Sequence, residues 1–194
     1  MRNVQTTCRF LLLGAITCGL AGGSLPEPAQ SRANYRTEAE DLHHFAEFVE
    51  WPQSANDGNK VPTTTINFCI LGQDPFGSSL DNSVLGHPVG DRKPTLVRGK
   101  RFEDFGECDV LFVSSSETKL QSRILNRLNG SAVLTVGETS DFAASGGIIQ
   151  FVPAGNRVNF LINVDAAGRA GLKILAALLA LARVIHDGAG KSGR

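Results

Sequence analysis

Two glycine-rich segments resemble parts of a phosphate-binding loop, and neither completes that pattern. Gly188–Ser192 ends in the Lys-Ser pair of such a loop, but it follows an expected helix and has Ile185 where the first glycine belongs. Gly72–Gly77 follows an expected strand in the correct six-residue frame, with Ser78 where the lysine belongs. Neither segment therefore predicts a nucleotide site.

The second segment is still a candidate ligand site because of its place in the chain. Local structure accounts for its residues, since Asp74 would cap a helix and Pro75 would take the first helical position. Open α/β sheets, however, bind ligands at the carboxyl ends of their parallel strands. The ends of two expected strands therefore define a candidate ligand cleft, formed by Gly72, Asp74, Ser114 and Ser115.

Other residue types that could do chemistry lack the partners that the chemistry needs. His43 and His44 are adjacent, so on a helix they point about 100° apart, which favours a solvated pair over shared metal ligation. Ser114–Ser116 ends an expected strand without an assigned general base, and no Gly-x-Ser-x-Gly elbow is present. His87 and His186 have no spacing that pairs them with a nucleophile. We expect no catalytic residue, metal ligand or cofactor.

The N-terminus is typical of a secretory signal peptide. Two arginines precede the apolar run Phe10–Ala21, and small residues follow it. The run is about 12 residues long and a bilayer span takes roughly 20, so it does not predict a membrane anchor. We expect residues 1–29 to be a signal peptide and short leader, cleaved between Ala21 and Ala29. The alternatives are a buried N-terminal helix and a lipoprotein site at Cys18.

Export leaves Cys69 and Cys108 in an oxidising compartment. Each lies in or beside a β-branched and aromatic run, 65–71 or 108–114, that predicts a buried strand. Neighbouring strands can bring two such side chains within bridging distance, so a disulfide is favoured over two inert thiols. A zinc site on these cysteines is not expected, because there is no Cys-x-x-Cys pair and His87 is the only histidine between them.

The charge balance excludes two classes of protein. The chain of 194 residues has 19 basic and 19 acidic residues, a formal net charge of +0, which excludes a strongly basic nucleic-acid binder and a polyacidic buffer. Removal of residues 1–33 leaves a net charge of about −2. Basic residues gather near a short expected strand and form either a solvated sheet edge or a docking face for an acidic partner. They are Arg92, Lys93, Arg98, Lys100 and Arg101.

The remaining elements alternate between strand and helix. Leu42, Phe45, Ala46 and Val49 form one apolar stripe, which predicts a helix over 34–50. The other expected elements are strands 65–71, 95–98, 109–114 and 132–136, helices from Pro75 and over 117–129, a helical turn near 140–144, a hairpin of 147–152 with 157–163, and a helix over 166–186.

This alternation predicts an α/β fold with three layers. A mostly parallel sheet is flanked by helices, and the C-terminal antiparallel hairpin lies at one edge. We expect a single domain over 34–187 and a flexible tail over 188–194. The final helix is apolar all round from Ile174 to Ala182, which predicts burial inside the monomer or against a partner.

Seven segments in this order resemble the YfiR family, and together they span nearly the whole exported chain. They are His43–Pro52, Phe68–Gly77, Cys108–Val113, Val133–Gly137, Phe142–Phe151, Val158–Asn163 and the start of the last helix at Ala170–Lys173. The resemblance implies a dimeric periplasmic protein with a Cys69–Cys108 disulfide and no catalytic residues. A second cysteine pair found late in some relatives has no counterpart here.

The resemblance also implies a regulatory function. Proteins similar to YfiR bind the periplasmic part of an inner-membrane diguanylate cyclase and repress it, which lowers cyclic-di-GMP and biofilm formation. A peptidoglycan-binding lipoprotein of the outer membrane relieves the repression. The alternative is a periplasmic small-molecule binding domain or sensor subunit that uses the strand-end cleft. The third hypothesis for the function is an enzyme.

Overall fold

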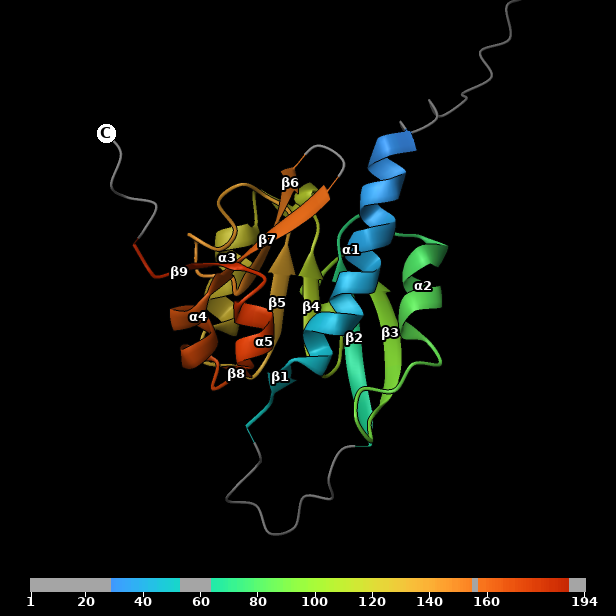
Figure 1. Cartoon of the computed structure of the whole chain (residues 1–194), viewed down its shortest axis with the longest axis horizontal. Helices are drawn as coiled ribbons and strands as arrows, with labels where there is room; N and C mark the ends of the chain where they lie inside the picture. Colours follow the sequence, from blue (N-terminus) through green and yellow to red (C-terminus); the bar gives the residue numbers. More distant parts are fainter. Residues whose placement is uncertain (1–28, 53–63, 155–156, 189–194) are drawn as a thin grey trace, which may run out of the picture.

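A seven-stranded mixed sheet forms the centre of the molecule (Figure 1). The computed structural model describes residues 29–52, 64–154 and 157–188, so the expected signal peptide up to residue 28, residues 53–63 and the expected tail after Gly188 lie outside the described residues. The strands, in spatial order, are β3 (Lys93–Gly99), β2 (Thr65–Leu71), β4 (Val110–Val113), β5 (Leu134–Gly137), β6 (Ile149–Ala154), β7 (Arg157–Asn163) and β9 (Arg183–Ile185).

Strand direction agrees with the fold class expected from the sequence. The strands from β3 to β6 are parallel, β6 and β7 form the antiparallel hairpin, and β9 runs parallel to β7. The short strand β9 pairs outside the hairpin, which therefore lies one strand in from the end of the sheet. A separate antiparallel pair joins β1 (Val49–Glu50) to β8 (Lys173–Ile174).

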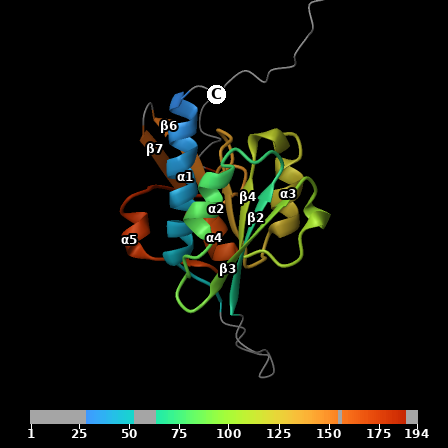
Figure 2. The same ribbon diagram turned by 90° about the vertical axis from the view of Figure 1, so that its right-hand side faces the viewer.

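Helices cover both faces of the sheet, as the turned view shows (Figure 2). On one face α1 (Ala29–Glu47) and α2 (Ser78–Val84) pack together, and α3 (Gln121–Leu128) covers the other. Two short helices, α4 (Val164–Arg169) and α5 (Ala176–Leu179), follow the hairpin. None of the helices in the described part of the chain has the length and apolar character needed to cross a membrane.

Strand β2 shows why the sheet can be covered on both sides. Its residues alternate between the two faces, so Ile66, Phe68 and Ile70 join the core under α1 and α2, while Cys69 and Leu71 join the cluster under α3. A strand that is buried on both faces is a nearly continuous apolar run, which is how residues 65–71 appear in the sequence.

The apolar stripe of the first helix is buried as expected, but the helix has different ends. Leu42, Phe45 and Ala46 are all almost fully buried. The helix runs from Ala29 to Glu47 rather than over 34–50, and Val49 is in β1. The chain leaves the helix there because the backbone of 49–50 pairs with β8.

The expected helix over 166–186 is wrong. Helix α4 stops because Gly171 adopts a positive φ of 69° and closes a Schellman turn. In that turn the Gly171 N–H donates to the Gly168 carbonyl and the Leu172 N–H donates to the Ala167 carbonyl, both at 3.0 Å. Backbone pairing then draws 173–174 to β1, where the Leu175 N–H donates to the Phe48 carbonyl.

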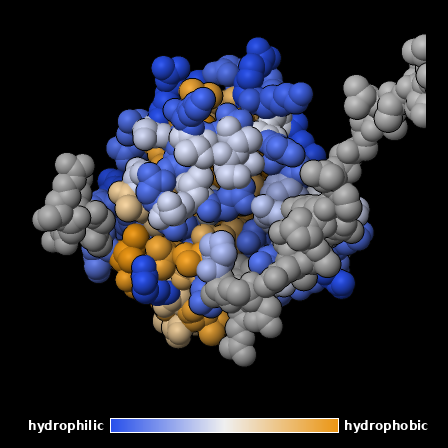
Figure 3. All heavy atoms as spheres, turned by 90° about the horizontal axis from the view of Figure 1, so that it is seen from above, coloured by the Kyte–Doolittle hydropathy of each residue, from blue (hydrophilic) through white to orange (hydrophobic). Residues whose placement is uncertain are grey.

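The apolar run in this region is consequently much more exposed than a core helix would be. Leu178 is buried in the core, but Leu181 is 75% exposed and Val184 is also exposed. Figure 3 shows a hydrophobic area of surface at its lower left, on the side of the molecule where α5 lies. The expectation of burial within the monomer therefore holds only for part of the run.

The cysteines form the expected disulfide. Cys69 lies in the middle of β2, and Cys108 lies two residues before β4, with 6.0 Å between their Cα atoms. Asp109 also links the start of β4 to β2, because its carboxylate accepts the Asn67 N–H at 2.8 Å and an Arg92 N–H at 2.5 Å.

Candidate partner-binding site

The four residues of the expected ligand cleft do lie at neighbouring strand ends, where most of their polar groups are already paired. Asp74 accepts the Phe76 N–H at 2.7 Å and the Arg98 guanidinium at 2.6 Å. The Ser114 hydroxyl accepts the Ser116 N–H, and the Ser115 N–H donates to Glu138 at 2.7 Å. These internal hydrogen bonds use several of the groups that could recognise a ligand, and the ligand cleft stays a prediction.

Glycine is needed at position 72 of this cleft because a side chain from the neighbouring turn lies directly against its backbone. Gly72 has a φ of 95°, and a Cβ there would lie 2.3 Å from the Ser116 hydroxyl oxygen. That hydroxyl accepts the Gln73 N–H at 2.9 Å, so the turn after β4 is seated directly on the end of β2. The next helix begins at Ser78 and not at Pro75 as expected. The reason is that the Asp74 carboxylate accepts N–H groups of the turn after β2 and does not cap the helix.

A groove lies next to this cleft, between α3 and the loop that follows β3. Its cavity is about 190 Å³. Apolar side chains contribute to it from both sides, among them Leu120, which is 46% exposed. We call it the α3 groove; it is lined by Leu71, Lys100, Arg101, Phe102, Glu103, Glu117, Leu120, Arg123, Ile124 and Arg127.

Intramolecular contacts hold the loop side of the groove in place. Arg127 lies over the Phe102 ring, 4.5 Å from its centroid, and pairs with Glu103 at 2.7 Å. Asp104 accepts the backbone N–H groups of Lys100 and Arg101. Hydrogen bonds from the Arg101 backbone and side chain, joined by the Lys100 N–H, hold the pKa of Asp104 below its usual range.

The five basic residues singled out in the sequence fall into two groups. Arg92 and Arg98 pair with carboxylates, Arg92 with Asp109 and the partly exposed Arg98 with Asp74 and Asp81. Lys93, Lys100 and Arg101 are exposed, and Arg101 pairs with Asp104, three residues later in the sequence, at 3.0 Å. The two residues of this set that belong to β3, Lys93 and Arg98, lie on an outer strand of the sheet, consistent with edge protection.

Two of the cations that remain available to a partner lie at the groove, whereas exposed Lys93 is another that lies outside it. Among the described residues, neither the Lys100 amino group nor the Arg123 guanidinium has a carboxylate within 4 Å. Both line the α3 groove beside apolar side chains. An apolar floor with a basic rim suits a segment that presents hydrophobic and acidic side chains together. Arg123 is a residue that the sequence pattern did not single out, since nothing in the sequence places it beside Lys100.

The disulfide lies beneath the same surface. Cys69 packs in the cluster that also contains Leu111, Ile124 and Leu125, with Phe102 and Phe105 against it. Cys108 ends the loop that forms the outer wall of the groove. The covalent link thus ties one end of that wall to the central strand β2.

A buried carboxyl group that sequence reasoning missed lies on α1. Glu38 is only 6% exposed, and one of its carboxylate oxygens has no hydrogen-bond partner in the described part of the chain. Burial raises its pKa to about 8, and the negative charges of Glu138 and Asp41 add to the effect. The signal was its position four residues before Leu42, on the apolar stripe of the helix.

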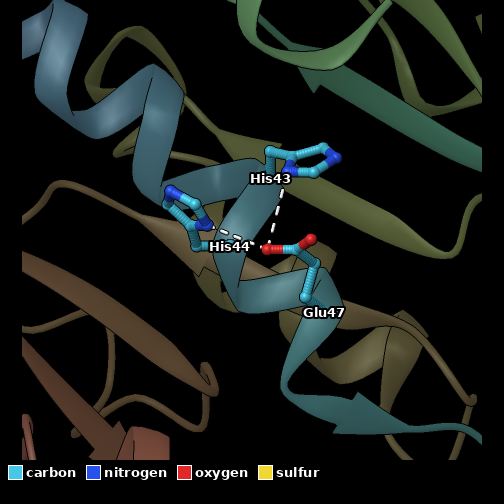
Figure 4. Close-up of side chains that lie close together, drawn as sticks. All are labelled: His43, His44 and Glu47. Carbon is cyan, nitrogen blue, oxygen red and sulfur yellow. Dashed lines mark hydrogen bonds and ion pairs between the residues drawn. The ribbon is translucent and has the colours of Figure 1, made fainter. Parts of the chain in front are cut away.

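The adjacent histidines are not the solvated pair that their spacing favours. His43 is 8% exposed, and its Nε2 is 2.9 Å from the carbonyl oxygen of His87. His44 turns instead toward Glu47, and the two rings approach that carboxylate from either side (Figure 4). Packing against the segment after α2 causes the difference, because it sets the orientation of the His43 ring.

Fold and surface together define a class of protein: a disulfide-linked α/β domain with an apolar groove that has basic residues on its rim. The sequence model of the YfiR/HmsC-like family matches residues 35–183. The chain belongs to this family, as its ordered motifs imply. Proteins of the family are periplasmic regulators and are not known as enzymes.

Proposed function

We propose that this protein binds the periplasmic part of an inner-membrane diguanylate cyclase and represses it, so that cyclic-di-GMP and biofilm formation fall. Membership of the YfiR/HmsC-like family over residues 35–183 carries this proposal. The protein acts by stoichiometric binding: it shifts the cyclase toward its inactive state because it binds that state more tightly. An outer-membrane, peptidoglycan-binding lipoprotein relieves the repression.

The α3 groove is the surface that we assign to the cyclase. Its rim carries Lys100 and Arg123 without carboxylate partners among the described residues, and its floor includes the half-exposed Leu120. The matching segment of the cyclase is acidic with apolar side chains. The disulfide supports this role because it holds the loop that bears Lys100.

A pull-down from solubilised inner membranes tests the proposal. The tagged, exported protein should recover a membrane protein whose sequence contains a diguanylate cyclase domain, and co-expression should lower cyclic-di-GMP. Lys100→Glu with Arg123→Glu should weaken capture at least about tenfold. The matched control is Lys93→Glu, another exposed lysine reversal outside the groove. A folded bait that recovers no cyclase would instead favour the small-molecule binding domain, which a thermal-shift screen with metabolites would then detect.

Self-association is assigned to a different surface. The exposed apolar side chains around Leu181 and Val184 suit an interface between two copies of the chain. Leu181→Lys should convert a dimer to a monomer in sedimentation velocity, whereas Leu120→Lys should leave the dimer intact and weaken cyclase capture. A monomeric unmodified protein would refute the dimer.

Export by the N-terminal segment is part of the same proposal. Residues 1–29 have the basic, apolar and small-residue order of a signal peptide and short leader. The intact mass of the protein from the periplasmic fraction should correspond to cleavage between Ala21 and Ala29. A mass increased by a lipid on Cys18 would identify a lipoprotein instead.

A further inference from the structure

Three side chains at the end of α1 bring metal-ligand atoms together outside the α3 groove. One ligand atom each from His43, His44 and Glu47 lies within 4.8 Å of the others. The Glu47 Oε2 atom is 2.9 Å from His44 Nδ1 and 3.9 Å from His43 Nδ1 (Figure 4). This cluster lies between α1 and α2 on one side of the sheet, whereas the groove lies on the side covered by α3.

A hydrogen bond behind His43 prepares its ring for a metal ion. The Nε2 atom is 2.9 Å from the His87 carbonyl oxygen, which can only accept a hydrogen bond. Nε2 must therefore carry the proton, so in the neutral ring Nδ1 has a free lone pair directed at Glu47. A backbone carbonyl that holds the outer N–H of a histidine is the usual support of a metal ligand.

The donor set and its spacing suit zinc. Two imidazole nitrogens and one carboxylate oxygen form a common three-residue zinc site, which leaves a fourth position open to water. Tetrahedral bonds of about 2.0–2.1 Å place ligand atoms about 3.3 Å apart, and the two distances to Glu47 lie on either side of that value. Binding requires side-chain rotation and release of the proton that His44 Nδ1 donates to the Glu47 carboxylate in the metal-free protein.

The surroundings leave room for the ion and its water. The three side chains line a cavity of about 710 Å³ between α1 and α2, whose other walls include Ser79, Asn82 and Ser83. Arg36 also lines it, but pairs with Glu40 at 3.5 Å, so its positive charge is offset. The Glu47 carboxylate supplies a negative charge for the cation.

From this geometry we propose that His43, His44 and Glu47 bind one Zn²⁺ ion per chain. The ion links the last turns of α1, and through the His43–His87 hydrogen bond it stabilises the connection between α2 and β3. This site is independent of the proposed repression of a cyclase, because it uses neither the groove nor the disulfide.

Equilibrium dialysis of the purified, EDTA-stripped protein against Zn²⁺ tests the site, with Co²⁺ absorption as a spectroscopic probe. We expect saturation at one ion, retained binding in excess Mg²⁺, and a Co²⁺ spectrum without a thiolate charge-transfer band. His44→Ala and Glu47→Gln should each weaken binding at least about tenfold. Both residues are partly exposed, so these variants should fold, and their circular dichroism spectra should match that of the unmodified protein.

His186→Ala is the matched control, since His186 is another exposed histidine beside a carboxylate, Asp165. It should bind Zn²⁺ as tightly as the unmodified protein. The proposal is overturned if no saturable binding occurs below about 1 mM Zn²⁺. It is also overturned if His44→Ala and Glu47→Gln bind as tightly as the control.

Discussion

Removal of the disulfide perturbs both the stability of the sheet and the wall of the α3 groove. The variant combines Cys69→Ala with Cys108→Ala. Alanine is preferable to serine at position 69, because Cys69 is 1% exposed and a hydroxyl there would be buried in an apolar cluster.

The expected decrease in the free energy of unfolding follows from the length of the loop that the disulfide closes. The bridged residues are 39 apart in sequence, and closing such a loop in the unfolded chain corresponds to about 4 kcal/mol in the chain-entropy account. Domains of this size are stable by about 5–15 kcal/mol, so the variant should remain folded at 25 °C with a much smaller margin.

Equilibrium unfolding in urea measures this loss. The free energy of unfolding should fall by about 3–5 kcal/mol with a lower midpoint, and reduction of the unmodified protein should give the same result. A fall of less than about 1 kcal/mol would refute the assignment of stability to the cross-link.

The same variant tests the link between the disulfide and the groove. Without the bond to β2, the loop 100–107 should become sensitive to limited proteolysis before the rest of the chain unfolds. Repression of the cyclase should weaken in parallel. Repression that is unchanged in a folded variant would show that the cross-link does not position the partner surface.

Three further substitutions test other parts of the structure. The pKa of Glu38 is raised from 4.5 to about 8, so the folded state keeps a proton that the unfolded chain releases, and stability should fall as the pH rises through that range. In urea unfolding, the unmodified protein should lose up to about 4 kcal/mol of stability between pH 5 and pH 8 relative to the Glu38→Gln variant. Parallel pH profiles of stability for the two proteins would contradict this. Asn163→Ala should lower the free energy of unfolding by about 2–4 kcal/mol in the same assay, because buried Asn163 caps α4 and donates to the Ala143 carbonyl. A decrease below about 1 kcal/mol would show that these bonds contribute little. Arg98→Ala should lower the free energy of unfolding by only about 1 kcal/mol or less, since its ion pairs are partly exposed. It should leave cyclase capture unchanged. Loss of capture in the folded variant would show that the docking surface extends along β3.

Local patterns were sufficient for the central elements. The buried strand over 65–71 has the bounds that its apolar run predicts. The stripe of Leu42, Phe45 and Ala46 is buried as its spacing requires. The cysteine pair is bonded as export and strand placement favour. These features depend on side-chain periodicity and on the number of cysteines, which can be read directly from the chain.

Features that depend on distant backbone partners could not be predicted in this way. The apolar run after Gly171 has a helical pattern, yet pairing of 173–174 with 49–50 and of 183–185 with β7 overrides that preference. The α3 groove combines the loop after β3 with a helix more than 15 residues later. Its basic rim therefore differs from the basic cluster in the sequence.

The sequence by itself determined the fold class, the family and the disulfide, because periodicity, motif order and cysteine count are properties of the chain. Only the tertiary structure decided which charges are available and which are paired. Arg98 is held by Asp74 and Asp81, whereas Lys100 and Arg123 face the groove. The physical reason is that packing orients side chains by contacts between elements, and those contacts are not encoded in spacing along one element.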